Sequence, residues 1–147
     1  TPVETPSLFP TSTLIPTPTI TQKNYTKYYN NTLKYFADME LCYEKAIKEH
    51  QSNNIPAFTA TMEECEMMGF NAQSEIDKID ARYLFRVKSN LASALKNYSI
   101  VSGIKLLPDV SSPYLTTDIL ESVKNQAVVK ARTYVEGAKK EWEATNK

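Results

Sequence analysis

Glycine, histidine and cysteine are all scarce in this chain of 147 residues. Its three glycines suit long helices with few tight turns and leave no glycine-rich loop to cradle phosphate. Its one histidine, His50, has Ile47 three positions before it, which excludes the Glu-x-x-His pairs of di-iron bundles. No C-x-x-C pair is present to hold zinc, attach haem or support thiol redox chemistry. We therefore predict no catalytic residue, no metal and no cofactor, in a protein that is not an enzyme.

A long apolar run and an excess of one charge are also missing. No stretch approaches the roughly 18 apolar residues of a membrane-spanning helix, so we predict no transmembrane segment. The 17 basic and 17 acidic residues give a formal net charge of zero, which argues against nucleic acid as a partner. The sequence starts at Thr1, and an export signal or a membrane or wall anchor upstream is compatible with that start.

What the chain has in abundance at its start is proline and threonine. Residues 1–22 contain five prolines and seven threonines, so we expect an extended, polyproline-like arm in front of a helical domain formed by residues 23–147. In composition the arm resembles the Thr/Pro stalks of bacterial and archaeal lipoproteins and surface proteins. Its apolar residues Phe9, Leu14 and Ile15 favour docking on the bundle or on a neighbouring subunit. A tail without a role is the alternative.

Apolar residues recur at three- and four-residue spacing from Asn24 to His50 and again from Ile55 to Val101. This spacing is typical of amphipathic helices. A short polar stretch separates the two segments, and Pro56 suits the first turn of the second helix. Because the connection is so short, the two helices are expected to form an antiparallel hairpin.

The second helix is the longest expected element, and Gly69 is its one weak point. The apolar stripe keeps its phase across Gly69, so we favour a continuous or kinked helix over a break. Gly103 marks its end, and Ser112 with Pro113 opens a last helix that runs to about Ala144. The predicted fold is an elongated, all-α antiparallel bundle of three long helices, or of four if the chain breaks at Gly69. In the three-helix form the central helix outruns its neighbours and leaves apolar surface uncovered at its ends.

Cys42 and Cys65 are the only cysteines, and each lies on the apolar face of its helix. They stand at nearly equal distances from the turn at residues 51–54, so the hairpin brings them level. We predict a Cys42–Cys65 disulfide, with two free buried thiols as the alternative. A disulfide implies an oxidising compartment and therefore export. Three N-x-S/T sequons, candidate glycosylation sites that also favour export, lie at Asn24, Asn30 and Asn97.

Tyrosine is the one unusual enrichment, with nine residues in the chain. Four of them stand at helical spacing in the first helix and are candidates for a ligand or partner surface: Tyr25, Tyr28, Tyr29 and Tyr35. Apolar rings with polar tips can line a groove for a glycan or a peptide, whereas in the alternative they pack the bundle and direct their hydroxyls to water. Arg82 and Arg86 form a one-turn basic pair that could receive an anion, but ion pairs with Asp77 and Asp80 are favoured.

These patterns predict a non-catalytic helical module, located outside the cell or on its surface and held there by the Thr/Pro stalk. It would act as a structural or interaction subunit that associates with a protein partner or with itself. The alternative function is a bundle that binds a small ligand or a glycan through the tyrosine-rich first helix.

Overall fold

The computed structural model describes residues 17–106 and 115–145 of the chain. These residues form helices without any strand, which confirms the prediction of an all-α protein. The elements are α2 (Thr17–Gln51), α3 (Ile55–Asp77), α4 (Ala81–Ser102), the 3-10 helix η2 (Gly103–Leu106) and α5 (Thr117–Thr145). The arm residues Phe9, Leu14 and Ile15, together with Ser112 and Pro113, lie outside the described residues.

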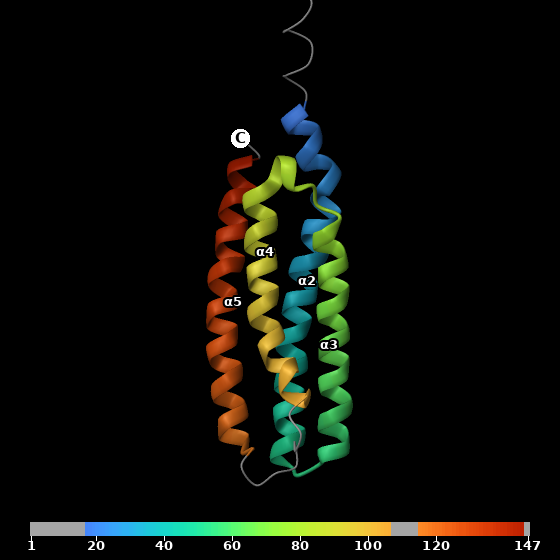
Figure 1. Ribbon diagram of the computed structural model, residues 1–147, viewed down its shortest axis with the longest axis vertical. Coiled ribbons are helices and arrows are strands. Elements are labelled where there is room, and N and C mark those ends of the chain that lie inside the picture. Colours follow the sequence, from blue (N-terminus) through green and yellow to red (C-terminus); the bar gives the residue numbers. More distant parts are fainter. Residues whose placement is uncertain (1–16, 107–114, 146–147) are drawn as a thin grey trace, which may run out of the picture.

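The four long helices lie side by side, and each runs opposite to the one before it (Figure 1). The start of α2 and the end of α5 are at one end of the bundle. Helix α2 packs most extensively on α3, and α4 on α5, so the bundle consists of two hairpins. In cross-section α2 and α4 touch across the bundle, whereas the described parts of α3 and α5 do not touch.

One continuous core runs through all four helices. Its largest fully buried side chains come from α2, α3 and α4 and include Tyr43, Phe58, Met62 and Tyr98. Helix α5 contributes Leu120 and a row of small residues instead. The small side chains on α5 let it approach α4 closely, since helices pack nearer where their facing residues are small.

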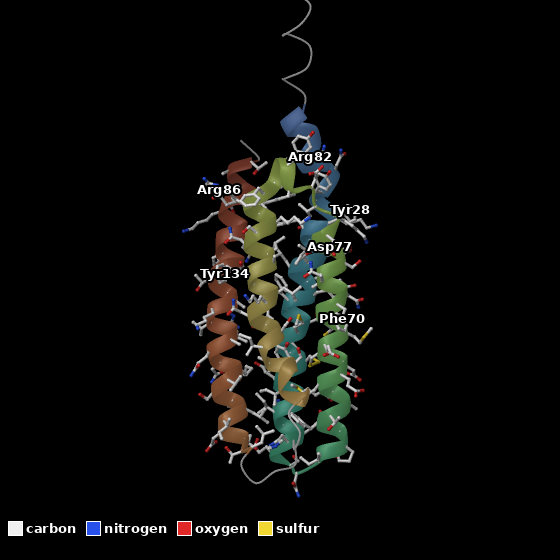
Figure 2. The ribbon with its side chains drawn as sticks, viewed as in Figure 1. Tyr28, Phe70, Asp77, Arg82, Arg86 and Tyr134 are labelled. Carbon is white, nitrogen blue, oxygen red and sulfur yellow. A yellow bond between two sulfur atoms is a disulfide. The ribbon has the colours of Figure 1, made fainter. Side chains whose placement is uncertain are left out.

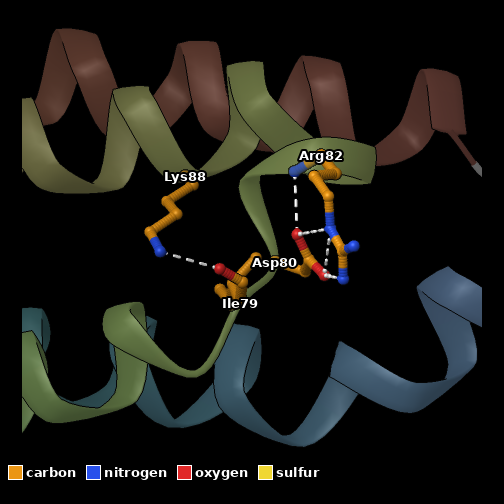
Figure 3. Close-up of polar contacts among 4 residues, drawn as sticks. All are labelled: Ile79, Asp80, Arg82 and Lys88. Carbon is orange, nitrogen blue, oxygen red and sulfur yellow. Dashed lines mark hydrogen bonds and ion pairs between the residues drawn. The ribbon is translucent and has the colours of Figure 1, made fainter.

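The prediction of one continuous helix from Ile55 to Val101 is wrong, because the chain reverses between α3 and α4 (Figure 3). Asp80 is the N-cap of α4, and its carboxylate accepts the backbone N–H of Arg82 at 2.9 Å. The carbonyl of Ile79 accepts a hydrogen bond from Lys88 Nζ at 2.8 Å. Since capping satisfies backbone groups that a helix end leaves unpaired, these contacts fix the reversal.

The predicted alternative break at Gly69 is also wrong. Gly69 is buried in the middle of α3, where a Cβ would meet Met39 Cε at 3.4 Å. The hydrophobic pattern missed the true turn because Ile79, inside the turn, is fully buried like Ile76 before it. Uncovered helix ends were expected only for a three-helix bundle, and the described residues form four long helices.

Two helix starts differ from those expected. Helix α2 begins at Thr17, inside the segment predicted as an extended arm. Pro18 lies in its first turn, where the missing N–H of proline costs no intrahelical hydrogen bond. Helix α5 begins at Thr117, because the side chain of Thr116 accepts the backbone N–H of Ile119 at 3.2 Å and caps the helix there.

The α2–α3 hairpin is closed by the predicted disulfide. Cys42 and Cys65 are bonded, with their Cα atoms 5.7 Å apart, and both are buried. The turn between the helices uses Asn53 in the left-handed region, at φ 59°, and Asn54, whose side chain accepts the backbone N–H of Ala57. Asparagine tolerates both roles, so this polar turn sets the register that brings the cysteines level.

Removing the disulfide tests its contribution to stability. Cys42→Ala/Cys65→Ala should lower the free energy of unfolding by about 3 kcal/mol, since the bond closes a loop that would otherwise add entropy to the unfolded chain. Urea denaturation followed by circular dichroism measures the change. Wild type in reductant should match the double variant, and reductant should not affect the variant. Equal stability of oxidised wild type and double variant would contradict the expectation.

Candidate functional site

Among the grooves on the described part of the bundle, two lie at the boundaries between the two hairpins. The α2–α5 groove has a volume of about 710 Å³. Phe36 and Tyr98 line its floor, and Leu33, Leu41 and Val135 are among the residues of its walls. An aromatic floor with aliphatic walls suits an apolar ligand or a side chain of a partner.

A polar network of Glu40, Tyr98 and Arg132 crosses the α2–α5 groove. The Tyr98 hydroxyl donates to Glu40 Oε2 at 2.5 Å, and Arg132 binds the same carboxylate through Nη2 at 2.5 Å and Nε at 3.2 Å. The Tyr43 hydroxyl donates to the backbone carbonyl of Tyr98 at 2.6 Å. The network therefore joins α2, α4 and α5 through charge-assisted hydrogen bonds, which are stronger than neutral ones.

The ionisation of this network follows from its contacts. Burial raises the pKa of Glu40, but the hydrogen bonds from Arg132 and Tyr98 outweigh it, so its pKa ends below the ordinary value. Burial and the hydrogen bond to Glu40 raise the pKa of Tyr98 well above its ordinary value. At neutral pH Glu40 is thus a carboxylate held by two donors, and Tyr98 keeps its proton.

The second groove, the α3–α4 groove, has a volume of about 390 Å³. Small residues are prominent in its lining, among them Gly69, Ala92 and Ser99. Phe70 lies at its rim on α3 and is 60% exposed (Figure 2). The result is a shallow depression beside a protruding aromatic ring.

The structure does not bring the four candidate tyrosines of α2 into one cavity. Tyr29 is buried and stacks on Trp142 of α5, with ring centroids 4.1 Å apart. Tyr25 and Tyr28 are neighbours at 6.4 Å, and Lys78 lies 5.4 Å above the Tyr28 ring. The other candidate, Tyr35, packs against the core.

The two arginines at the start of α4 make different ion pairs. Arg82 binds Asp80 at 2.6 Å, as expected, and hydrogen bonds from Arg82 lower the pKa of Asp80 to about 2. Arg86 instead contacts Glu141 of α5 at 3.6 Å. Asp77 accepts a hydrogen bond from Gln73. The pair is therefore divided between two carboxylate partners.

The three sequons lie in different surroundings. Asn24 and Asn30 are exposed on α2, so a glycan on either would point into solvent. Asn97 on α4 is half-buried, and its side-chain amide donates to the backbone carbonyl of Ser93 at 2.9 Å. Asn97 is consequently the least accessible of the three in the folded protein.

Spacing in the sequence did not predict Glu40, Tyr98 and Arg132 as a group. Their contacts span separations of 58 and 92 residues, so they depend on the register between helices. The one available signal was Tyr98 on the apolar stripe, since a buried hydroxyl requires a partner.

No family model matches the chain, and neither a curated protein nor a solved structure matches it. Within residues 17–106 and 115–145, no helix combines the length and apolar character that crossing a membrane requires. The same residues contain no group of three or more histidine, cysteine or acidic side chains placed to hold a metal ion.

Removing the Tyr98 hydroxyl tests the network. Tyr98→Phe should lower the free energy of unfolding by about 2 kcal/mol, because a hydrogen bond to a charged group is lost in a buried position. Tyr134→Phe is the matched control, since Tyr134 is 40% exposed on α5, and it should leave stability nearly unchanged. Urea denaturation of both variants gives the comparison. Equal effects of the two substitutions would rule out a special role for Tyr98.

The network also predicts how stability depends on pH. The pKa of Glu40 is lower in the folded than in the unfolded protein. The contribution of its carboxylate to stability is therefore complete above the unfolded pKa of about 4.3, and it is lost as pH falls through the folded pKa. Glu40→Gln should therefore be less stable than wild type near neutral pH, and the gap should shrink below about pH 4. Denaturation across this pH range measures the gap. A gap that widens on acidification would refute the assignment.

Proposed function

We propose that this protein is a non-catalytic, exported helical module that acts as a structural or interaction subunit and is tethered by its Thr/Pro stalk. The observation that carries the proposal is the Cys42–Cys65 disulfide. It links two helices inside the core, with Cys42 6% and Cys65 0% exposed. A disulfide so shielded serves structure rather than redox exchange, and such bonds persist in oxidising compartments outside the cytosol.

The position of the helix ends supports tethering. The start of α2 lies at one end of the bundle, and the α2–α3 turn lies at the other (Figure 1). A stalk joined to α2 would therefore leave the full length of the bundle projecting from the surface that anchors it. Composition alone supports the stalk itself, since proline-rich segments act as semi-rigid spacers.

Exposed apolar side chains support the interaction role. Leu41, Phe70, Phe85 and Val129 are each at least 60% exposed. Met67 lies one helical turn from Phe70 on α3 and is 56% exposed. Single exposed apolar residues are ordinary, but neighbours beside a groove are a feature of surfaces that bind partners.

The α2–α5 groove favours a second candidate function, binding of a small ligand. Its volume lies within the usual range for ligand sites, and Phe36 and Tyr98 give it an aromatic floor. None of the four candidate tyrosines of α2 is among the residues that line this groove, and Tyr29 is buried against Trp142. A ligand here would contact the exposed side of Arg132 instead.

Labelling of intact source cells tests the exported location. A membrane-impermeant, amine-reactive biotin reagent should label the exposed lysines of the chain without lysis. After thiol blocking, the same chain should run as the oxidised form on a non-reducing gel. A cytosolic protein from the same cells is the control and should stay unlabelled. If labelling needs lysis and both cysteines react with the blocking reagent, the exported location is wrong.

A further inference from the structure

We propose that this chain carries N-linked glycans at Asn24 and Asn30 of α2, whereas Asn97 of α4 stays unmodified. The inference rests on the exported location proposed above, because such glycans are added to Asn-x-Ser/Thr sequences of exported chains. Tyrosine or asparagine, and never proline, holds the middle position of the three sequons. The motif is therefore complete at all three, and their surroundings in the fold distinguish them.

Asn30 is the outward member of its sequon. The side-chain amide of Asn31 donates to Glu75 Oε1 of α3 at 2.6 Å. Thr32 is fully buried, and its hydroxyl donates to the backbone carbonyl of Tyr28 at 2.8 Å. Asn30 itself is exposed to solvent. A glycan on Asn30 would thus extend away from the bundle without displacing a packed side chain.

Glycans on α2 are compatible with the interaction role. Asn24, like Asn30, is exposed. Neither residue is among those that line the α2–α5 groove or the α3–α4 groove. Both grooves would therefore stay open to a partner in the glycosylated protein.

Asn97 lies on a side of α4 where a glycan does not fit. It stands seven residues after Asn90, and residues seven apart share one side of an α-helix. Asn90 faces α5 so closely that a Cβ on Gly137 would come within 2.8 Å of Asn90 Oδ1. Asn97 is also half-buried, and its amide donates to the carbonyl of Ser93. A glycan there would break this hydrogen bond and crowd α5.

The chemistry of attachment determines its timing. The amide nitrogen of Asn30 forms a bond to the first sugar carbon of a lipid phosphate-linked oligosaccharide. The bond from that carbon to the phosphate oxygen breaks, the lipid phosphate leaves with the electron pair, and the amide loses one proton. The motif requires the hydroxyl residue as well as the asparagine, but residues two apart on a helix point about 200° from each other. Since folded α2 buries Thr32, attachment precedes folding.

The surface of the chain gives these glycans a physical role. The formal net charge is zero, and large apolar side chains such as Leu41, Phe70 and Phe85 are exposed. Chains without net charge lack the repulsion that keeps proteins apart, and exposed apolar groups add to their tendency to associate. Bulky, hydrophilic glycans oppose such unspecific association.

Peptide mass spectrometry of the full chain purified from its source cells tests the assignment. Trypsin cleaves after lysine, so the three sequons fall on separate peptides, residues 24–27, 28–34 and 97–105. The first two peptides should carry sugar masses, and the third should have its sequence mass alone. Sequence mass alone at Asn24 or Asn30 would overturn the assignment of that residue, and a sugar mass on Asn97 would overturn the argument from the fold.

Substitutions made in the source cells give an independent readout. Asn24→Gln and Asn30→Gln should each remove one glycan and increase gel mobility by one step, and the double variant should show both steps. Asn71→Gln is the matched control, because Asn71 is exposed on α3 but outside any sequon, and it should leave the mobility unchanged. Equal mobility of the double variant and wild type would contradict the inference.

Failure of this inference is distinguishable from failure of the proposed location. A chain that is labelled on intact cells but has no sugar on Asn24 and Asn30 contradicts the glycans alone. A chain that is labelled only after lysis and has no sugar contradicts the exported location and, with it, the glycans.

Discussion

The hydrogen bonds through Tyr98 hold the two hairpins of this bundle together. One hairpin, α2–α3, is closed by a covalent bond, while the other, α4–α5, is held by extensive packing and by the Arg86–Glu141 ion pair. Tyr98 of α4 donates to Glu40 of α2, which in turn binds Arg132 of α5. Because the partly buried carboxylate of Glu40 would lose donors in another register, this contact favours the register in which both hairpins reach it.

This division into hairpins explains where the grooves lie. Packing is most extensive within each hairpin, and the α2–α5 and α3–α4 boundaries between them are looser. Both grooves follow these two boundaries. A polar network crosses one of them, whereas the other has a lining of small residues and a projecting ring. Surfaces available to a partner therefore follow from the way the two halves of the chain assemble.

Apolar spacing predicted the helices, and the equal distances of the cysteines from one turn predicted their pairing. Both patterns are local, because the apolar spacing depends on one helix and the cysteine pairing depends on the register of one hairpin. The reversal before α4 was hidden, because Ile79 inside the turn is as buried as Ile76 in the helix. The one sequence signal for this reversal was Asp80, because aspartate is a preferred N-cap residue at the start of a helix. The Glu40–Arg132 contact depends on four helices being in place, so no pattern along the chain reveals it.

Three of the nine tyrosines, Tyr29, Tyr43 and Tyr98, have a structural role in the interior. Tyrosine supplies a large apolar ring, but a buried hydroxyl must find an acceptor. The Tyr43 hydroxyl donates to the backbone carbonyl of Tyr98, the Tyr98 hydroxyl donates to the carboxylate of Glu40, and the Tyr29 ring stacks on Trp142. Burial raises the pKa of Tyr29 and of Tyr43 to about 12, so both hydroxyls stay protonated at neutral pH. At Tyr43 and Tyr98 these half-polar rings join helices through hydrogen bonds as well as through packing.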